Sequence, residues 1–204
     1  MKNALVLAAC AVLFTAVPAF AHGAHEHGVA RLNVAVDGST VDIDLESPLA
    51  NPLSFEHAPS TPEQRQAVQD MAVNLRRAED IFVFPAAAQC RLKSVTLESE
   101  ALPADLLQAA ATPQTQTAAA TGAQQPAAAT GDGHDQHDGH EQGAEHADLD
   151  AAFSFECAHP EALHGMDVRL FAQWPALHEL RVQLVTPAGQ HAAELTSQAH
   201  QLSW

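Results

Sequence analysis

Residues 29–46, VARLNVAVDGSTVDIDLE, decide how the rest of the chain folds. Apolar side chains occupy every second position in each half of this stretch: Ala30, Leu32, Val34 and Val36, then Val41, Ile43 and Leu45. Such alternation is typical of a strand with one buried face. Gly38 and Ser39 between the halves favour a turn, so the stretch predicts a β-hairpin of two half-buried strands.

One principal helix is predicted after the hairpin. Ser47 and Pro48 end the second strand, and residues 51–59 are expected to form a loop. Thr61 followed by Pro62 is a typical helix start, with the threonine as N-cap. Apolar side chains then recur at helical spacing as far as about Glu79: Ala67, Val68, Met71, Ala72, Leu75 and Ala78.

Further strands are predicted on both sides of a long polar region. Residues 81–84 form a short buried run, and a strand with Val95 and Leu97 on one face is expected at residues 90–99. The remaining strands are expected at residues 153–157, 166–171, 180–185, 190–195 and 201–204. We therefore expect an α+β protein, mostly β, in which two antiparallel strand-rich segments (residues 22–100 and 151–204) accompany one principal helix.

The segments are joined by residues 101–150, which are predicted to be a disordered linker. Its first part is rich in Ala, Thr, Gln and Pro, and only residues 104–111 could carry a transient helix. Residues 130–148, TGDGHDQHDGHEQGAEHAD, have hardly an apolar side chain to bury. The burial of side chains therefore cannot offset the entropy lost by ordering this backbone.

The same stretch has the composition of a metal-binding loop. Its histidines are His134, His137, His140 and His146, and carboxylates lie between them. Imidazole and carboxylate together suit borderline divalent cations, above all Zn²⁺, although Ni²⁺ and Cu²⁺ remain open. The alternative is a solvated acidic spacer, but the density of histidines favours metal binding. Ordering a flexible loop costs entropy, so its sites should suit capture and hand-over.

A second histidine group, HGAHEHG, occupies residues 22–28. On an extended stretch His25 and His27 face the same way. Together with His22 or a new α-amine they could form a three-ligand site with an open fourth position. The alternative is a frayed terminus.

The remaining histidines are weaker candidates. His57 is a lone loop histidine, more typical of a structural role, unless the fold brings it beside residues 22–27. His159 and His164, with Glu161 between them, could form a second small metal site. A structural role for the two histidines fits the sequence equally well. The others are predicted to be surface residues: His178, His191 and His200.

The first 21 residues have the pattern of a secretory signal. Lys2 provides the basic start, residues 4–17 the short apolar core, and Ala19-Phe20-Ala21 the cleavage site. A lipoprotein box ending at Cys10 is the rival, but its apolar core would be unusually short. The formal net charge of −16 argues against nucleic acid and anionic membranes as partners and suits cations.

Loss of Cys10 with the signal leaves Cys90 and Cys157, which flank the linker. Two cysteines in an exported chain most often form a disulfide. The alternative is a Cys/His zinc site. An enzyme is not expected, because the sequence has neither a His-Glu-x-x-His helix nor a Gly-x-Ser-x-Gly elbow.

At HGAHEHGVARLNVAVDG (residues 22–38), LESPLANPLSFEHAPSTPEQ (residues 45–64), the two cysteines and the His-rich centre, the chain resembles a known family. It is similar to the zinc-regulated periplasmic zinc-binding proteins of proteobacteria, the ZrgA type. The resemblance implies zinc binding in the periplasm and help to the high-affinity zinc ABC importer and its binding protein. In other members of the family we expect glycine at the position where this chain has Ser54.

We therefore predict a periplasmic protein that captures Zn²⁺ and assists its uptake. The structured site is assigned to His22, His25, His27 and His57, and the flexible site to His134, His137, His140 and His146. An alternative is a metal buffer that sequesters Zn²⁺, Ni²⁺ or Cu²⁺ without an importer. A third possibility is a structural interaction module whose histidines sense pH.

Overall fold

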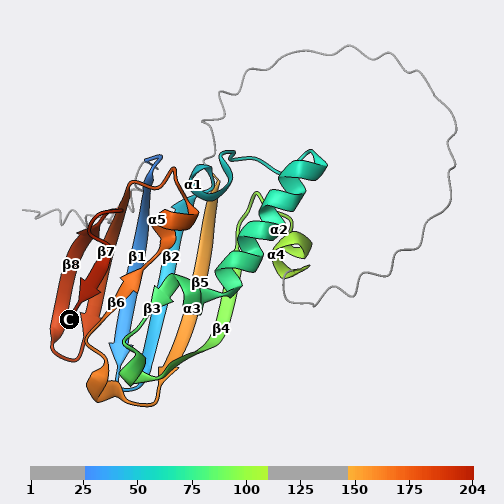
Figure 1. The fold of residues 1–204 in the computed structure, drawn as a ribbon. Helices are drawn as coiled ribbons and strands as arrows, with labels where there is room; N and C mark the ends of the chain where they lie inside the picture. Colours follow the sequence, from blue (N-terminus) through green and yellow to red (C-terminus); the bar gives the residue numbers. More distant parts are fainter. Residues whose placement is uncertain (1–25, 110–146) are drawn as a thin grey trace, which may run out of the picture.

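The structure is a computed structural model that describes residues 26–109 and 147–204 (Figure 1). Several predictions concern other residues and lie outside the described ranges. They are the signal peptide, most of the linker, and the candidate ligands His22, His25, His134, His137, His140 and His146.

A six-stranded sheet forms the body of the fold, with strand order β4-β5-β2-β1-β7-β8. The strands are β1 (Val29–Asp37), β2 (Thr40–Pro48), β4 (Cys90–Glu98), β5 (Asp148–Cys157), β7 (Glu179–Thr186) and β8 (Gly189–Leu195). The predicted hairpin is confirmed, because β1 and β2 pair antiparallel from Arg31 opposite Glu46 to Asp37 opposite Thr40. Gly38, at φ 58°, makes the turn.

Strands from both halves of the chain are hydrogen-bonded to one another within this sheet (Figure 1). β5 lies between β2 and β4 and pairs antiparallel with both. β7 pairs with β1 in parallel, which differs from the antiparallel pattern we expected. The long chain between these two strands allows the crossover that parallel strands need. The two strand-rich segments therefore build one sheet and share one core.

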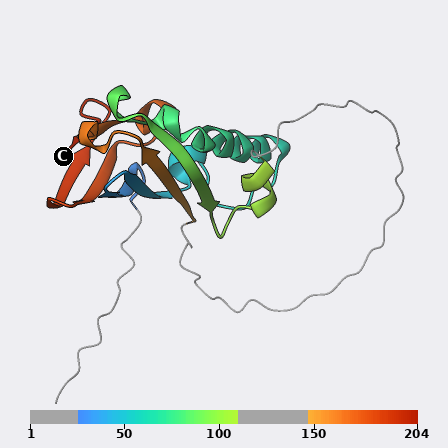
Figure 2. The ribbon, with the colours of Figure 1, turned by 90° about the horizontal axis from the view of Figure 1, so that it is seen from below.

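A second layer covers one face of the sheet (Figure 2). It contains a three-stranded sheet in the order β3-β6-β9, made of β3 (Phe82–Val83), β6 (Gly165–Val168) and β9 (Gln201–Ser203). Its helices are α1 (Ala50–Leu53), α2 (Pro62–Arg76), α3 (Ala78–Ile81), α4 (Ala104–Ala109) and α5 (Leu170–Gln173), with 3₁₀ turns at Ala86–Ala88 and Pro160–Ala162. Leu32, Ile43 and Leu75 are fully buried between the layers. This arrangement confirms the mostly β, α+β class.

The helix start at Pro62 is confirmed. Thr61 Oγ1 accepts a hydrogen bond from Gln64 N (3.2 Å), and the Gln64 side chain accepts one from Thr61 N (3.4 Å). This reciprocal pair is a capping box. The helix ends at Arg76 and not near Glu79, because Arg77 has a non-helical backbone (φ −95°, ψ 46°). None of the helices in the described ranges has the length and hydrophobicity needed to cross a membrane.

Three short helices differ from the sequence-based expectations. α1 lies where residues 51–59 were expected as loop, and α5 begins within the strand predicted over residues 166–171. α4 was expected as a transient helix, but Leu106 and Leu107 are 3% and 2% exposed and pack into the core. Short apolar runs do not distinguish a strand from a helical turn. α4 and the first residues of β5 fall within the range assigned to the linker.

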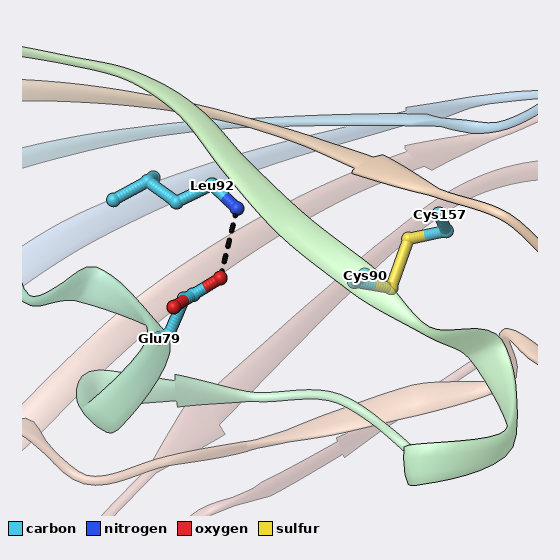
Figure 3. Close-up of a disulfide and its surroundings, with 4 residues drawn as sticks. All are labelled: Glu79, Cys90, Leu92 and Cys157. Atoms are coloured by element: carbon cyan, nitrogen blue, oxygen red, sulfur yellow. Dashed lines mark hydrogen bonds between the residues drawn. A yellow bond between two sulfur atoms is a disulfide. The ribbon is translucent and has the colours of Figure 1, made fainter.

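Cys90 and Cys157 form a disulfide at the point where they face each other across β4 and β5 (Figure 3). The predicted disulfide is therefore confirmed, and the alternative, a zinc site that uses both thiolates, is wrong. A second contact holds the same edge strand, since Glu79 Oε1 of α3 accepts a hydrogen bond from Leu92 N (3.1 Å). β4 is thus attached both to its neighbouring strand and to the helical layer.

The other face of the sheet is open to solvent and carries a row of carboxylates. Glu98, Asp150 and Glu46 occupy directly opposite positions on β4, β5 and β2. Like charges in such positions destabilise a sheet. Burial raises the pKa of Asp150, and the charges of Glu46, Glu98 and Glu100 raise it further. Ionised Asp150 therefore opposes folding.

Replacing Asp150 with asparagine is expected to raise the free energy of unfolding at pH 7 by about 0.5 kcal/mol. The raised pKa means that the native state keeps its proton to higher pH than the unfolded chain. Stability is therefore lost as pH rises above the ordinary aspartate value of 3.8, and the gain from asparagine should vanish near pH 3. Urea unfolding at both pH values measures this difference.

The matched control for that variant is Asp42→Asn. Asp42 lies on the same face of β2, where its neighbours across the strands are Ser154 and Ala35. Because these neighbours are uncharged, we expect little change at either pH. An equal gain from Asp150→Asn at pH 3 and pH 7 would contradict the electrostatic explanation.

Candidate functional site

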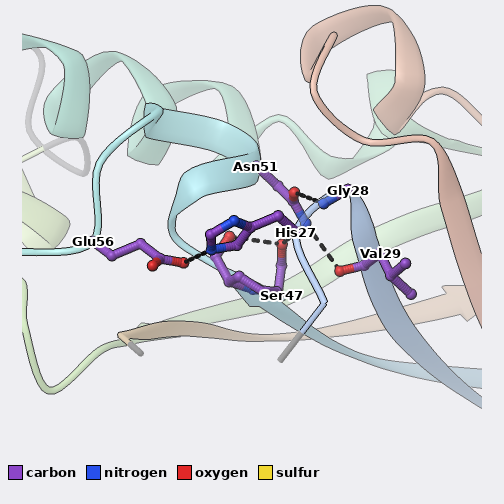
Figure 4. Close-up of polar contacts among 7 residues, drawn as sticks. His27, Gly28, Val29, Ser47, Asn51 and Glu56 are labelled. Atoms are coloured by element: carbon purple, nitrogen blue, oxygen red, sulfur yellow. Dashed lines mark hydrogen bonds and ion pairs between the residues drawn. The ribbon is translucent and has the colours of Figure 1, made fainter. Parts of the chain in front are cut away.

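The start of β1 is the point in the fold where His27 and the bend with Glu56 and His57 come together. β1 and β7 run parallel and begin at the same end of the sheet, and β2 ends there. His27 directly precedes this end of β1, and Glu56 lies in the bend that follows α1 (Figure 4). His57 is the next residue of that bend. The fold therefore brings the bend beside His27, as a ligand role for His57 required.

Asn51 of α1 holds this end of the sheet together. Its side chain is 3% exposed. Its Oδ1 accepts a hydrogen bond from Gly28 N (2.8 Å), and its Nδ2 donates to Val29 O and Ser47 Oγ (both 3.0 Å; Figure 4). One amide thus connects the start of β1 to the end of β2, and it fixes the backbone immediately after His27.

Gly28 is held from the β7 side as well. Its carbonyl accepts hydrogen bonds from His178 N (2.7 Å) and Glu179 N (3.0 Å). Its φ of +85° favours glycine, and a Cβ at this position would lie 2.6 Å from His178 Cδ2. The imidazole of His178 therefore packs directly over the residue that follows His27.

The chain is also held on the other side of His27. Glu26 Oε2 lies 3.0 Å from Arg181 Nη2, and Arg181 Nε lies 2.6 Å from Glu179 Oε1. Hydrogen bonds from Arg181 to Glu179 and to Glu26 raise the pKa of its guanidinium. His27 thus lies between two residues that are each attached to β7.

His27 itself faces Glu56. Its Nε2 lies 3.1 Å from Glu56 Oε1, and the two side chains are 61% and 19% exposed (Figure 4). Imidazole nitrogen and carboxylate oxygen are both zinc ligands. The pair therefore combines a solvent-accessible histidine with a more buried carboxylate that positions it.

His57 makes its contacts within the bend. Its Nδ1 donates a hydrogen bond to Ala58 O (2.9 Å), and its ring packs against Phe55 at a centroid distance of 5.2 Å. Donation from Nδ1 selects the tautomer in which Nε2 has a lone pair, the form that binds a metal ion. His57 thus has the structural contacts expected of a lone loop histidine and keeps one nitrogen suited to coordination.

Ser54 begins this bend in a left-handed backbone conformation. It caps α1 with φ 61° and ψ 17°, and its N–H donates to Ala50 O (3.1 Å). Glycine adopts this conformation without the penalty of a Cβ atom. Glycine, the residue expected at this position in relatives, would therefore suit this cap better than serine.

Replacing Ser54 with glycine is expected to raise the free energy of unfolding by about 0.5–1 kcal/mol, because the left-handed strain is removed. Ser54→Ala serves as the control, since alanine keeps the Cβ atom and should not stabilise the protein. Chemical denaturation of the three proteins measures both effects. A glycine variant less stable than the alanine variant would contradict this explanation.

The end of the predicted linker joins the fold beside the same site. β5 and β1 both pair antiparallel with β2, so they begin at the same end of the sheet. Leu49 N donates to Ala147 O (2.9 Å), only two residues before Asn51 binds Gly28. His146 directly precedes Ala147 in the sequence. Both predicted histidine groups are therefore connected to the fold at this end.

His159 and His164 lie elsewhere. They follow the far end of β5, where His159 Nδ1 is 3.3 Å from Glu161 Oε1 and His164 O accepts a hydrogen bond from Trp204 N (3.2 Å). The structure does not bring them together with His27. Within residues 26–109 and 147–204, no three His, Cys, Asp or Glu side chains are close enough to hold a metal ion.

Three residues of this site were not predicted from the sequence. Glu56 could have been suspected as the neighbour of His57, but neither Asn51 nor His178 had a sequence pattern that indicated its role. His178 is exposed as predicted, yet it packs against Gly28. Another predicted surface histidine, His200, is partly buried with its Nδ1 2.7 Å from Asp167 Oδ1.

A β-rich scaffold with a histidine and a carboxylate paired at one end defines a candidate metal-binding protein. Comparison with known families makes the class more specific. The family model described as ZrgA family zinc uptake protein matches residues 24–204, so the chain belongs to this family. Its role is therefore related to zinc uptake, as the sequence resemblance implied. No curated protein matches the chain.

Proposed function

We propose that the protein captures Zn²⁺ in the periplasm through histidine-rich sites and assists uptake by a high-affinity ABC importer. The observation that carries this proposal is the contact between His27 and Glu56, at the end of the sheet to which both predicted histidine groups are connected. Export by the predicted signal, residues 1–21, would place the protein where zinc enters the cell envelope.

The geometry supports reversible capture. Zinc usually takes four ligands, and His27 with Glu56 supplies two of them from a fixed backbone. The histidines at positions 22 and 25 are the proposed remaining ligands, and the central histidines supply the second, weaker site. His57 does not lie close enough to His27 and Glu56 in the structure to complete a set of three ligands. When further segments must become ordered to complete a site, the loss of their conformational entropy weakens binding. Such a site should therefore release its ion more readily than a closed structural site.

The proposal includes no catalytic role. A zinc hydrolase needs a positioned general base and a shaped pocket as well as the metal. The sequence contains neither of the motifs that usually supply these groups, as shown above. Zinc is therefore the cargo of this protein, and Ni²⁺ or Cu²⁺ would compete for the same ligands.

Calorimetric zinc titration tests the capture step on tag-free protein. The intact chain is expected to show a tighter and a weaker class of sites. The double variant His25→Ala/His27→Ala should lose the tighter class, whereas deletion of residues 131–146 should lower the stoichiometry and leave the tighter class in place. His191→Ala, which removes an exposed histidine of β8, is the matched control and should change neither.

Growth of a deletion strain tests the importer step. Poor growth in chelated medium, restored by zinc, would support uptake. Normal growth there, combined with sensitivity to excess metal, would instead support the sequestering buffer. Protein that remains metal-free by elemental analysis after zinc exposure and dialysis would overturn the capture proposal itself.

A further inference from the structure

Strand β8 forms one edge of the six-stranded sheet, and its outer side is open. Within the described ranges its hydrogen-bonded neighbour in the sheet is β7 alone (Figure 1). The pairing is continuous from Leu180 opposite Leu195 to Thr186 opposite Gly189, so no bulge interrupts the strand. An edge strand of this kind presents a row of unpaired N–H and C=O groups to any further strand that can pair with them.

The opposite edge, β4, has protective features that β8 lacks. The register of β4 shifts between Leu92 and Ser94. Glu79 Oε1 accepts a hydrogen bond from Leu92 N, and Arg91 and Lys93 place positive charges on the strand. Irregular register and basic side chains oppose pairing with a further strand. β8 has the sequence GQHAAEL, without lysine, arginine or proline, so of the two edges it is the one suited to pairing.

The turn before β8 identifies the residues whose backbone groups point outward. Thr186 and Gly189 flank a two-residue turn, so they form a hydrogen-bonded pair, and such pairs recur at every second residue of the two strands. The residues between these pairs, Gln190, Ala192 and Glu194, therefore direct their N–H and C=O groups away from β7. These three residues are symmetric about Ala192, the middle residue of the strand.

A second copy of β8 is complementary to this edge. A seven-residue strand pairs antiparallel with a copy of itself over its whole length in a single register, which places Ala192 opposite Ala192 and Gln190 opposite Glu194. The residues with outward backbone groups then face one another, as an antiparallel ladder requires. No two carboxylates face each other, because the Gln190 amide is opposite the Glu194 carboxylate and can donate a hydrogen bond to it.

We propose that two copies of the protein associate through antiparallel pairing of their β8 strands, which joins the two sheets around a two-fold axis at Ala192. The second layer leaves room for this pairing, since His191 is opposite buried Leu184 on the layered face and is nevertheless exposed. The axis reverses the strand direction, so the two His27 sites would lie at opposite ends of the joined sheet. The inference therefore does not depend on the proposed function.

The association is expected to be weak and to tighten with salt. Two paired edge strands form an interface at the small end of the known range, for which a Kd of roughly 10–100 µM is expected. The formal net charge of −16 makes two copies repel each other, and salt screens that repulsion. Raising sodium chloride from about 0.05 to about 0.5 M should therefore lower the Kd roughly threefold.

Sedimentation equilibrium of the exported protein, in the presence of a chelator, tests the proposal at chain concentrations from about 5 to about 500 µM. Ala192→Lys and Ala192→Glu each place like charges opposite each other at the axis and should raise the Kd at least roughly tenfold. An equimolar mixture of these two variants should associate at least as tightly as the native protein. Gln183→Lys is the matched control, because it adds the same charge at the exposed position opposite Ala192 on β7, and it should change the Kd less than about twofold.

Circular dichroism establishes that the variants are folded, as expected for substitutions at an exposed residue. Native protein that stays monomeric throughout the concentration range would overturn the proposal. Equal weakening by Gln183→Lys, or a mixture of the two folded Ala192 variants that stays monomeric, would do the same. A dimer that forms only when zinc is added would also overturn it, because the histidines and not β8 would then join the copies.

Discussion

Replacing Asn51 with alanine is expected to lower the free energy of unfolding by about 3 kcal/mol, because buried hydrogen-bonding groups lose their partner. The amide is 3% exposed and serves Gly28 N, Val29 O and Ser47 Oγ. A cavity left by alanine in such a place also weakens packing. The same change releases the backbone beside His27, so the tighter class of zinc sites should weaken as well. Urea unfolding and zinc calorimetry measure the two effects.

Two controls separate this network from general effects of substitution. Asn74→Ala removes an exposed amide of α2 and should change the free energy of unfolding by less than about 0.5 kcal/mol. Asn51→Asp keeps an acceptor for Gly28 N but places a buried carboxylate oxygen against Val29 O and loses the donor to Ser47 Oγ, so it should be at least as destabilising as the alanine variant. A loss below about 1 kcal/mol for Asn51→Ala would show that other contacts hold this end of the sheet.

Removal of the disulfide is expected to have the largest effect on stability, about 4 kcal/mol by the loop-closure estimate. Cys90 and Cys157 are 67 residues apart in sequence, so the bridge restricts a long stretch of the unfolded chain. It also joins the ends of β4 and β5, and β4 lies at the edge of the sheet. The double variant Cys90→Ala/Cys157→Ala, compared with the native protein by urea unfolding, measures the loss.

A reducing agent provides the control for that comparison. Native protein unfolded in dithiothreitol should match the double alanine variant, and the variant itself should not respond to the reagent. A loss of less than about 1 kcal/mol in the variant would show that β4 is held mainly by its backbone hydrogen bonds and by Glu79. Zinc binding at the His27 site should change little, since that site lies at the opposite end of β5.

The features that were predicted correctly depend on residues close together in the chain. The alternation in residues 29–46 is enough to define two strands with one buried face. Thr61, Pro62 and Gln64 are enough to define a helix start. The metal-binding role of the histidines was predicted from composition, because histidine and carboxylate side chains select borderline metal ions whatever the fold, and it stays a prediction.

The features that were missed depend on long-range pairing or on very short elements. α1 and α5 each have four residues, which is too few for a periodic pattern. The parallel pairing of β1 with β7 joins strands from different halves of the chain, and nothing within either strand indicates it. Because His27 and Glu56 are 29 positions apart, their contact follows from that sheet and not from a motif.

The sequence by itself determined the half-buried hairpin, the start of α2 and the histidine and carboxylate chemistry of the protein. Each of these features depends on side chains that lie close together in the sequence. Only the tertiary structure decided that Asn51 joins Gly28 to the end of β2 and that β5 enters between β2 and β4. The physical reason is that strand register is chosen by the sum of many weak contacts across the whole buried face. The contact between His27 and Glu56 therefore depends on the assembled sheet.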